Sequence, residues 1–155
     1  MISNTPKFNL EAALTRLARP VPALMLTEAV KWLGTPYRTG GRDRNGVDAI
    51  GFLISCAAAA GLSVAEPDKT GAVAYDPKEL ANWLLSFCDF LPANSEILPG
   101  DILYHVYDDL NRADARLVFS PDRLIGPYLV KSCVKSCMDP YWSKQALYFR
   151  PRTAA

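Results

Sequence analysis

The chain has 155 residues, of which 50% are hydrophobic and 21% are charged, and its formal net charge is +1. This length suits one compact domain, and we expect residues 1–155 to form it. The near-neutral charge gives no basic surface for nucleic acid, and no apolar run approaches the roughly 20 residues of a membrane span. The N-terminus lacks the pattern of a cleaved secretion signal, so we expect synthesis in the cytoplasm without a signal peptide.

The four cysteines, Cys56, Cys88, Cys133 and Cys137, are scattered and form no CxxC pair. We interpret them as free, buried thiols. A disulfide between Cys133 and Cys137 would be strained in a helix or a strand, because residues four apart share one face of either element. A zinc site is not expected, since the chain has a single histidine, His105.

The first half of the chain predicts helices. Residues 8–18 have helical periodicity, Pro20 and Pro22 then interrupt it, and residues 23–33 form a second pattern. A loop rich in glycine, arginine and aspartate follows up to Val47. A third helix is expected over about 49–60, with Asp48 as its N-cap and Gly61 as its stop.

A short helix is predicted after Asp76 and Pro77, and from Asp101 onward the pattern favours strands. The strand-like stretches read ILYHVY, RLVFS, RLIGPYLVKSCV and ALYFR. Helices followed by strands predict an α+β fold, with a helix packed on a C-terminal antiparallel sheet. We expect an N-terminal extension over 1–22, a helical half over 23–98 and a sheet half over 99–152.

The start of the third helix has the features of a nucleophile's position. Unpaired N–H groups and the helix dipole stabilise an anion there, and they lower the pKa of a cysteine thiol. The same N–H groups can hold an oxyanion during acyl transfer. The residue at this place is Ala49, which has no reactive group.

This region resembles the nucleophile motif of the NlpC-type cell-wall cysteine peptidases, which have a papain-like fold. The family shows a GTPYR-GG segment and then G-D-C-S-G-F at the head of its central helix. Here the matching stretches are GTPYR at 34–38, Gly40-Gly41 and GVDAIGF at 46–52, with Ala49 in place of the cysteine. The resemblance implies the family's fold over about residues 25–150.

Pro99-Gly100-Asp101 resembles the family's PGD entry to the first strand of its sheet. Two other stretches resemble members from phage tails and gene-transfer particles. They are the GRD..GVD.IGFL pattern and Asp139-Pro140-Tyr141-Trp142 followed by Phe149-Arg150. The resemblance therefore implies a particle component, with tail hub or baseplate proteins and the peptidoglycan stem peptide as candidate partners.

The other catalytic positions of the family also lack its residues. By the resemblance, Arg116 occupies the place of the catalytic histidine and Gly126 that of the residue that orients it. We expect Arg116 to lie on a strand across from Ala49. His105 is the fallback base, or else a strand histidine near Asp108 or Asp109.

Several residues near this site have two readings. Asp48 is a structural cap or a catalytic acid, and Tyr37 faces the nucleophile position or simply packs. The basic loop of Arg38, Arg42 and Arg44 is solvated, or it contacts an acidic partner or a glycan-peptide carboxylate. Arg116 is a solvated strand residue or a carboxylate holder. Gly40-Gly41 lacks the lysine and spacing of a phosphate loop, so no cofactor is expected.

The sequence thus favours a catalytically inactive NlpC-like domain that acts as a structural or binding component of a phage-like tail tip or baseplate. Tyr37, Arg38, Asp48 and Arg116 would line its cleft. One alternative is a peptidoglycan-cleaving cysteine endopeptidase inactivated by an engineered cysteine-to-alanine change at Ala49. Another is an intracellular adaptor on the same fold.

Overall fold

A six-stranded antiparallel sheet forms one layer of the protein, with strand order β3-β8-β4-β5-β6-β7. The computed structural model describes residues 8–17, 20–67, 76–107, 112–128, 133–137 and 146–153. The strands span Cys88–Leu91 (β3), Ile102–Tyr107 (β4), Arg112–Ser120 (β5), Arg123–Tyr128 (β6), Cys133–Cys137 (β7) and Ala146–Pro151 (β8). Each strand from β4 to β6 pairs in the antiparallel direction with the strand that follows it in the chain.

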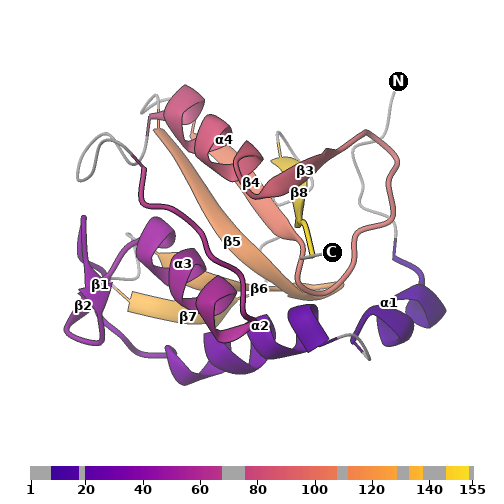
Figure 1. The fold of residues 1–155 in the computed structure, drawn as a ribbon, viewed down its shortest axis with the longest axis horizontal. Helices are drawn as coiled ribbons and strands as arrows, with labels where there is room; N and C mark the ends of the chain where they lie inside the picture. Colours follow the sequence, from indigo (N-terminus) through magenta and orange to yellow (C-terminus); the bar gives the residue numbers. More distant parts are fainter. Residues whose placement is uncertain are drawn as a thin grey trace.

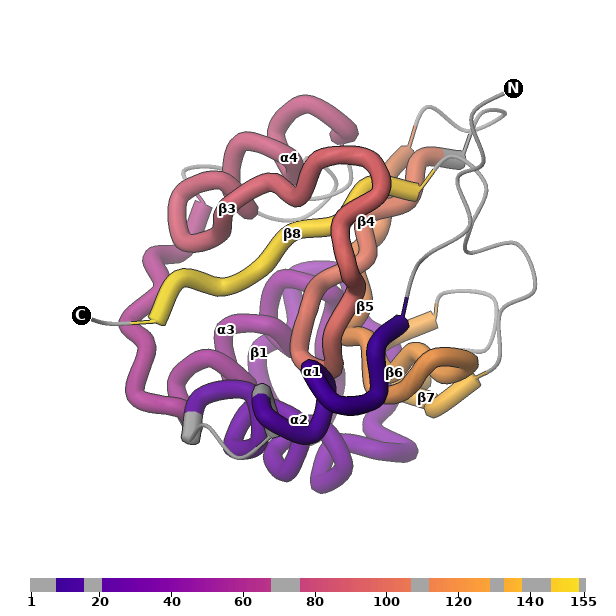
Figure 2. Tube along the Cα trace, turned by 90° about the vertical axis from the view of Figure 1, so that its right-hand side faces the viewer, coloured from indigo at the N-terminus to yellow at the C-terminus, as the bar shows by residue number. Residues whose placement is uncertain are grey.

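Four helices precede most of the sheet, and together the two layers confirm the predicted α+β class. The helices span Leu10–Leu17 (α1), Pro20–Lys31 (α2), Ala49–Ala59 (α3) and Pro77–Leu85 (α4). Figure 1 shows α3 and α4 in front of the same face of the sheet, with α2 alongside α3. In Figure 2, α1 lies at the end of the molecule nearest the viewer.

The main core lies between these helices and one face of the sheet. It contains Met25 of α2, Trp32 directly after α2, Phe52 and Leu53 of α3, and Trp83 of α4. The sheet contributes alternate residues to it, among them Ile102, Tyr104, Ala115, Leu117, Ile125 and Phe149. A second, smaller cluster of Ile97, Leu103, Val118, Leu124 and Tyr148 lies on the other face. This alternation follows from the two-residue period of a strand.

The structure differs from the sequence prediction at three boundaries. Pro20 and Pro22 do not interrupt a helix but begin α2, where their missing N–H groups cost nothing in the first turn. The predicted helical half, 23–98, contains the strand β3, which pairs with β8 at the edge of the sheet. The single strand expected over 123–134 is divided into β6 and β7, which pair with each other.

A small hairpin interrupts the loop before α3. Strands β1 (Arg42–Asp43) and β2 (Gly46–Val47) pair with each other, and Tyr37 forms a bridge to Val47. The segment just before it, Gly34 to Pro36, bonds to β7 at the edge of the sheet, through Gly34 N to Val134 O and Val134 N to Thr35 O, each at 2.9 Å. The loop is thus fixed at both ends before α3 begins.

In the described part of the chain, no helix has the length and apolar character that crossing a membrane requires.

Candidate functional site

Asp48 caps α3, which begins at Ala49 as predicted. The Asp48 side chain is fully buried and accepts the Gly51 N–H at 2.9 Å through Oδ1 and the Gly40 N–H at 2.8 Å through Oδ2. Arg42 Nη1 also donates to Oδ1 at 2.8 Å. With both oxygens engaged in this way, Asp48 joins the loop, the hairpin and the helix, which is the structural role that its capping position predicts.

Three glycines allow the loop and the helix to approach closely. A Cβ on Gly41 would lie 2.2 Å from the Gly46 carbonyl oxygen, and one on Gly51 would lie 2.4 Å from the Gly41 carbonyl oxygen. A Cβ on Gly46 would lie 2.5 Å from Cβ of Arg38. Such contacts are shorter than packed atoms tolerate, so the glycines of the GG and IGF stretches shape the backbone around Ala49.

Ala49 itself offers only a methyl group, and only 2% of it is exposed. The helix faces the sheet through Ile50, Phe52 and Leu53. The residues of β5 and β6 that belong to the same hydrophobic cluster are Ala113, Ala115, Leu117 and Ile125. Position 49 therefore supplies no nucleophile at the start of α3.

Arg116 does not lie across from Ala49 as expected. Its neighbours along β5, Ala115 and Leu117, pack in the cluster that contains α3, so strand alternation directs Arg116 to the opposite face. Its pairing partner on β4 is Leu103, which belongs to the second cluster. Arg116 lies on a strand, as expected, but the direction of its side chain depends on a strand register that the motif does not contain.

On that opposite face, Arg116 is part of a buried polar cluster with Asp114 and Tyr128. Its Nη2 donates to Asp114 Oδ2 at 2.7 Å, its guanidinium lies 3.9 Å from the centre of the Tyr128 ring, and only 2% of the residue is exposed. Gly126 is the neighbour that makes room, since a Cβ there would lie 3.0 Å from Arg116 Cγ. Arg116 is thus a buried carboxylate holder and not a solvated strand residue.

Asp114 is a residue that the motifs did not identify. Burial raises the pKa of its carboxyl group, and the charge of Arg116 opposes this effect. The negative charge of Asp48 raises the pKa of Asp114 further, so Asp114 interacts electrostatically with the cap of α3. The signal available in the sequence was the alternation in RADARLVFS, which places Asp114 and Arg116 on one face of β5.

His105 belongs to the same face as this polar cluster. It is half-buried on β4, and its pairing partners are Asp114 on β5 and Ala146 on β8. It is therefore on the side of the sheet away from the α3 cluster. Asp108 and Asp109, which we considered as its neighbours, lie outside the described residues.

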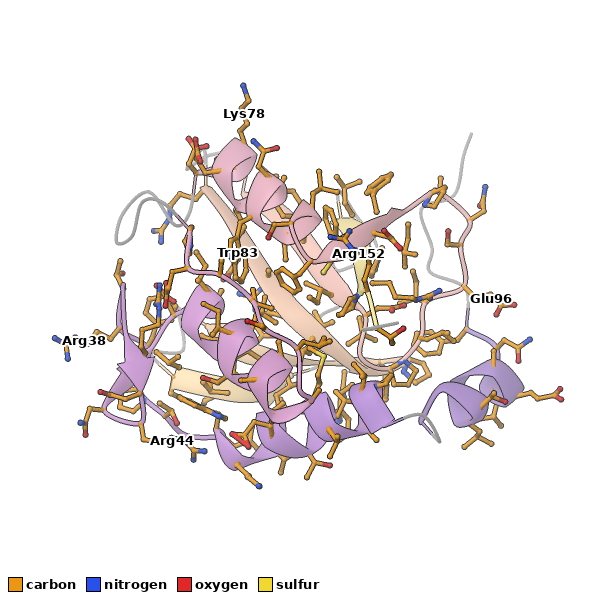
Figure 3. All side chains as sticks on the ribbon, in the orientation of Figure 1. Arg38, Arg44, Lys78, Trp83, Glu96 and Arg152 are labelled. Carbon is orange, nitrogen blue, oxygen red and sulfur yellow. The ribbon has the colours of Figure 1, made fainter. Side chains whose placement is uncertain are left out.

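Two of the three loop arginines bind residues of this chain. Arg42 bonds Asp48 and Glu66. Arg44 donates to the Lys31 carbonyl at 2.6 Å and lies 4.3 Å from the centre of the Trp32 ring. Arg38 is exposed and points away from the body of the protein in Figure 3.

Tyr37 is half-buried, and it packs against the main core. It stays beside the loop that precedes α3, since its backbone bridges to Val47. Its placement is that of a packing residue at the edge of the site.

The cysteines give no sign of a reactive thiol. All four are free, Cys56 and Cys88 are buried, and burial raises the pKa of both these thiols. Cys133 and Cys137 occupy the two ends of β7 and are half-buried. Among the residues that the structure describes, no three His, Cys, Asp or Glu side chains are grouped so that they could hold a metal ion.

Asp101 and Arg150 link two of the sequence motifs. Arg150 donates through Nε and Nη2 to the Asp101 carboxylate, with both distances at 2.9 Å, and the Leu98 N–H donates to the same carboxylate at 2.7 Å. Asp101 is fully buried. The PGD and FR stretches therefore form one structural unit in the sheet, and they stand apart from the start of α3. The Asp139 to Trp142 stretch lies outside the described residues.

Comparison with solved structures identifies the fold. The P60 domain of antigen MAP1272c from Mycobacterium avium paratuberculosis matches with a TM-score of 0.57 and 11% identity, covering 86% of this chain and 93% of that one. RipD of Mycobacterium tuberculosis, described as a non-catalytic NlpC/p60 domain protein adapted to peptidoglycan binding, matches with a TM-score of 0.57 and 13% identity, covering 88% and 99%. The peptidoglycan hydrolase RipB of the same organism matches with a TM-score of 0.61 and 14% identity, covering 87% and 66%.

Sequence comparison adds nothing to these matches, since no protein-family model and no curated protein matches the chain. At identities of 11 to 14%, the structural matches concern the fold. The helix that begins at Ala49, the antiparallel sheet behind it and these three relatives together establish that the protein has the NlpC/P60 fold.

Proposed function

We propose that this protein is a catalytically inactive NlpC/P60-type domain that acts as a binding or structural component. One observation carries the proposal: α3 begins with the buried methyl group of Ala49, directly after its cap Asp48, so the helix start has no nucleophile. A cysteine hydrolase needs a thiolate and a base at this place.

The size of the rate loss that follows removal of a nucleophile supports this proposal. Removing the nucleophile of a catalytic triad lowers turnover by a factor on the order of 10⁶. Ala49 is also only 2% exposed, so its methyl group presents almost no surface to a substrate. An oxyanion hole alone retains about 10³ to 10⁴ over water, and it requires access to the substrate.

We propose the peptide stem of peptidoglycan as the ligand. RipD supports this choice, because it has the same fold, is described as non-catalytic and is described as adapted to peptidoglycan binding. A domain that has lost its reactive group can keep a binding surface, since binding and bond cleavage depend on different groups.

The proposed setting is a phage-like tail tip or baseplate, with tail hub or baseplate proteins as partners. This part of the proposal depends on the GRD..GVD.IGFL and DPYW stretches and on their resemblance to tail-type members. Incorporation into such a particle after synthesis in the cytoplasm would give the domain access to the cell wall.

Purified insoluble peptidoglycan tests the proposal in two ways. We expect the protein to sediment with the peptidoglycan and to release no soluble fragments, while a RipB sample releases them in the same assay. Fragment release by the protein as it stands would overturn the inactive assignment. A failure to sediment, combined with recovery of a stable partner from host cells, would favour the intracellular adaptor.

A further inference from the structure

We propose that Arg42 is the binding group for a carboxylate of an acidic peptide, and that Glu66 occupies this position in the present structure. Arg42 Nε donates to Glu66 Oε1 at 2.7 Å, and Nη2 donates to Oε2 at 2.9 Å. This two-bond arrangement is the one in which a guanidinium recognises a carboxylate. The choice of a peptide as the ligand rests on the proposed function.

The guanidinium of Arg42 is held from behind, independently of Glu66. Its Nη1 donates to the fully buried carboxylate of Asp48 and to the Gly41 carbonyl, both at 2.8 Å. Its stem lies against α3, because a Cβ on Gly51 would be 3.1 Å from Arg42 Cδ. The edge formed by Nε and Nη2 therefore stays in place when Glu66 leaves, and a positioned guanidinium loses little entropy on binding.

Glu66 is the exchangeable member of the pair. Its side chain is 50% exposed, against 26% for Arg42, and the segment after Gly61 up to Pro67 belongs to no helix or strand. One residue earlier, the Ala65 carbonyl accepts the indole N–H of Trp83 at 2.9 Å. Leu62 and Val64 of this segment pack against the main core, whereas Glu66 is held by its two bonds to Arg42, which an incoming carboxylate can replace.

The position of Arg42 suits a ligand of this fold. Arg42 bonds Asp48, the residue immediately before Ala49. A carboxylate bound to the other edge of the guanidinium would therefore lie close to the start of α3. Arg38, on the same loop, has its stem on Gly46 and its exposed guanidinium directed to solvent. Arg38 could approach a second carboxylate of the same peptide, since long arginine side chains are flexible at the surface.

The internal pair sets the size of the expected effect. A partly exposed ion pair stabilises the closed arrangement by up to about 1 kcal/mol, which corresponds to about a fivefold preference. A ligand that needs the open arrangement has its apparent affinity lowered by the same factor. Removing the Glu66 charge should therefore tighten ligand binding by up to about fivefold.

Binding of a synthetic peptide measures this effect. The probe is acetyl-Ala-Glu-Ala-Ala with free carboxylates, and its all-amide counterpart has Gln and a C-terminal amide. We expect Glu66→Gln to lower the Kd of the acidic peptide about fivefold relative to the unchanged protein. Glu79→Gln is the matched control, because it removes the same charge from an exposed position in the first turn of α4. Equal affinities of the two variants would overturn the proposal.

Two further measurements separate this proposal from its alternatives. Arg42→Lys keeps the charge but loses the two-bond geometry, and we expect it to weaken acidic-peptide binding about tenfold in protein that melts cooperatively. Displacement of Glu66 together with its neighbour Ala65 should change the fluorescence of Trp83, with Trp83→Phe identifying the signal. A binding-induced signal with the all-amide peptide as strong as that with the acidic peptide would contradict carboxylate recognition.

These outcomes are distinct from those of the peptidoglycan assay. Sedimentation with peptidoglycan that is unaffected by Glu66→Gln and Arg42→Lys would leave the proposed function standing and refute the Arg42 site. Acidic-peptide binding that Glu66→Gln tightens, without sedimentation, would support the site and refute the peptidoglycan ligand.

Discussion

Arg150 donates two hydrogen bonds to the carboxylate of Asp101, each with an N···O distance of 2.9 Å, and the two residues are 49 positions apart in the sequence. Asp101 precedes β4 and Arg150 lies in β8, its neighbour in the sheet. The bond therefore fastens the start of one strand to the end of another, and the Leu98 N–H completes the carboxylate's environment. This contact gives the PGD and FR stretches a structural role in the sheet that does not depend on the chemistry at the start of α3.

Asp101→Asn should destabilise the protein by about 2 kcal/mol, because the amide cannot accept both donors of Arg150 and leaves a charge without its counter-ion. Urea denaturation measures the change in the free energy of unfolding. Asp122→Asn is the matched control, since Asp122 is exposed in the turn after β5. A cost below about 0.5 kcal/mol, the range of ordinary surface changes, would contradict the structural role.

Ala49→Cys should not create a peptidoglycan hydrolase. The new thiol would be as buried as the Ala49 methyl group, and Arg116, the residue aligned with the catalytic histidine, bonds Asp114 and stays protonated, so it cannot act as a base. Release of soluble fragments from purified peptidoglycan measures the outcome. Ala58→Cys, at an exposed position near the end of α3, is the thiol control. Release by Ala49→Cys alone would favour the engineered endopeptidase.

Gly51→Ala should cost about 3 kcal/mol or prevent folding, since its Cβ would lie 2.4 Å from the Gly41 carbonyl oxygen. Neither the helix nor the loop can move apart while Asp48 bonds to both of them. Thermal and urea unfolding measure the effect. Ser55→Ala in the same helix should change stability by less than about 0.5 kcal/mol. A stable Gly51→Ala variant would show that the loop is not packed as described.

Thiol labelling should divide the cysteines into two pairs. Burial raises the pKa of Cys56 and of Cys88, so both stay protonated and shielded in the folded protein near pH 8. Cys133 and Cys137 are half-buried and should react with iodoacetamide first. Mass spectrometry counts the adducts, and denaturation in urea should then expose all four thiols. Rapid native labelling of Cys56 would contradict its burial.

Asp114 should give the unfolding free energy a specific dependence on pH. Burial raises the pKa of Asp114 in the folded state, so the folded protein binds this proton more tightly than the unfolded chain does. Its contribution is complete below the unfolded value of about 3.9 and is lost as the pH rises through the raised value. The stability of the protein relative to Asp114→Asn should therefore fall as the pH increases from about 4. A difference that grows with pH would show that Arg116 outweighs burial.

Local signals in the sequence predicted the start of α3 and most of the strands. Asp48, the apolar run and Gly61 define a helix within a few residues, and Asp76 with Pro77 does the same for α4. These features depend on neighbours along the chain. They need no knowledge of how the sheet is arranged.

Features that depend on distant pairing were not predictable in the same way. The direction of Arg116 follows from the register of β4, β5 and β6, and one residue of register decides between two faces. The short strand β3 is defined by its pairing with β8, about sixty residues later in the chain, and its own four residues carry little signal. The pairing of Arg42 with Glu66 likewise depends on the loop after α3, which brings Glu66 back to a residue 24 positions earlier.

The close contacts among Gly41, Gly46 and Gly51 separate the shape of this region from its chemistry. These contacts involve backbone atoms and the side chains of Arg38, Arg42 and Val47, and the side chain at position 49 is not among the atoms nearest to these glycines. A substitution at position 49 can therefore abolish a reaction without disturbing the backbone geometry around the start of α3. The backbone geometry of this region can therefore outlast the reactive group.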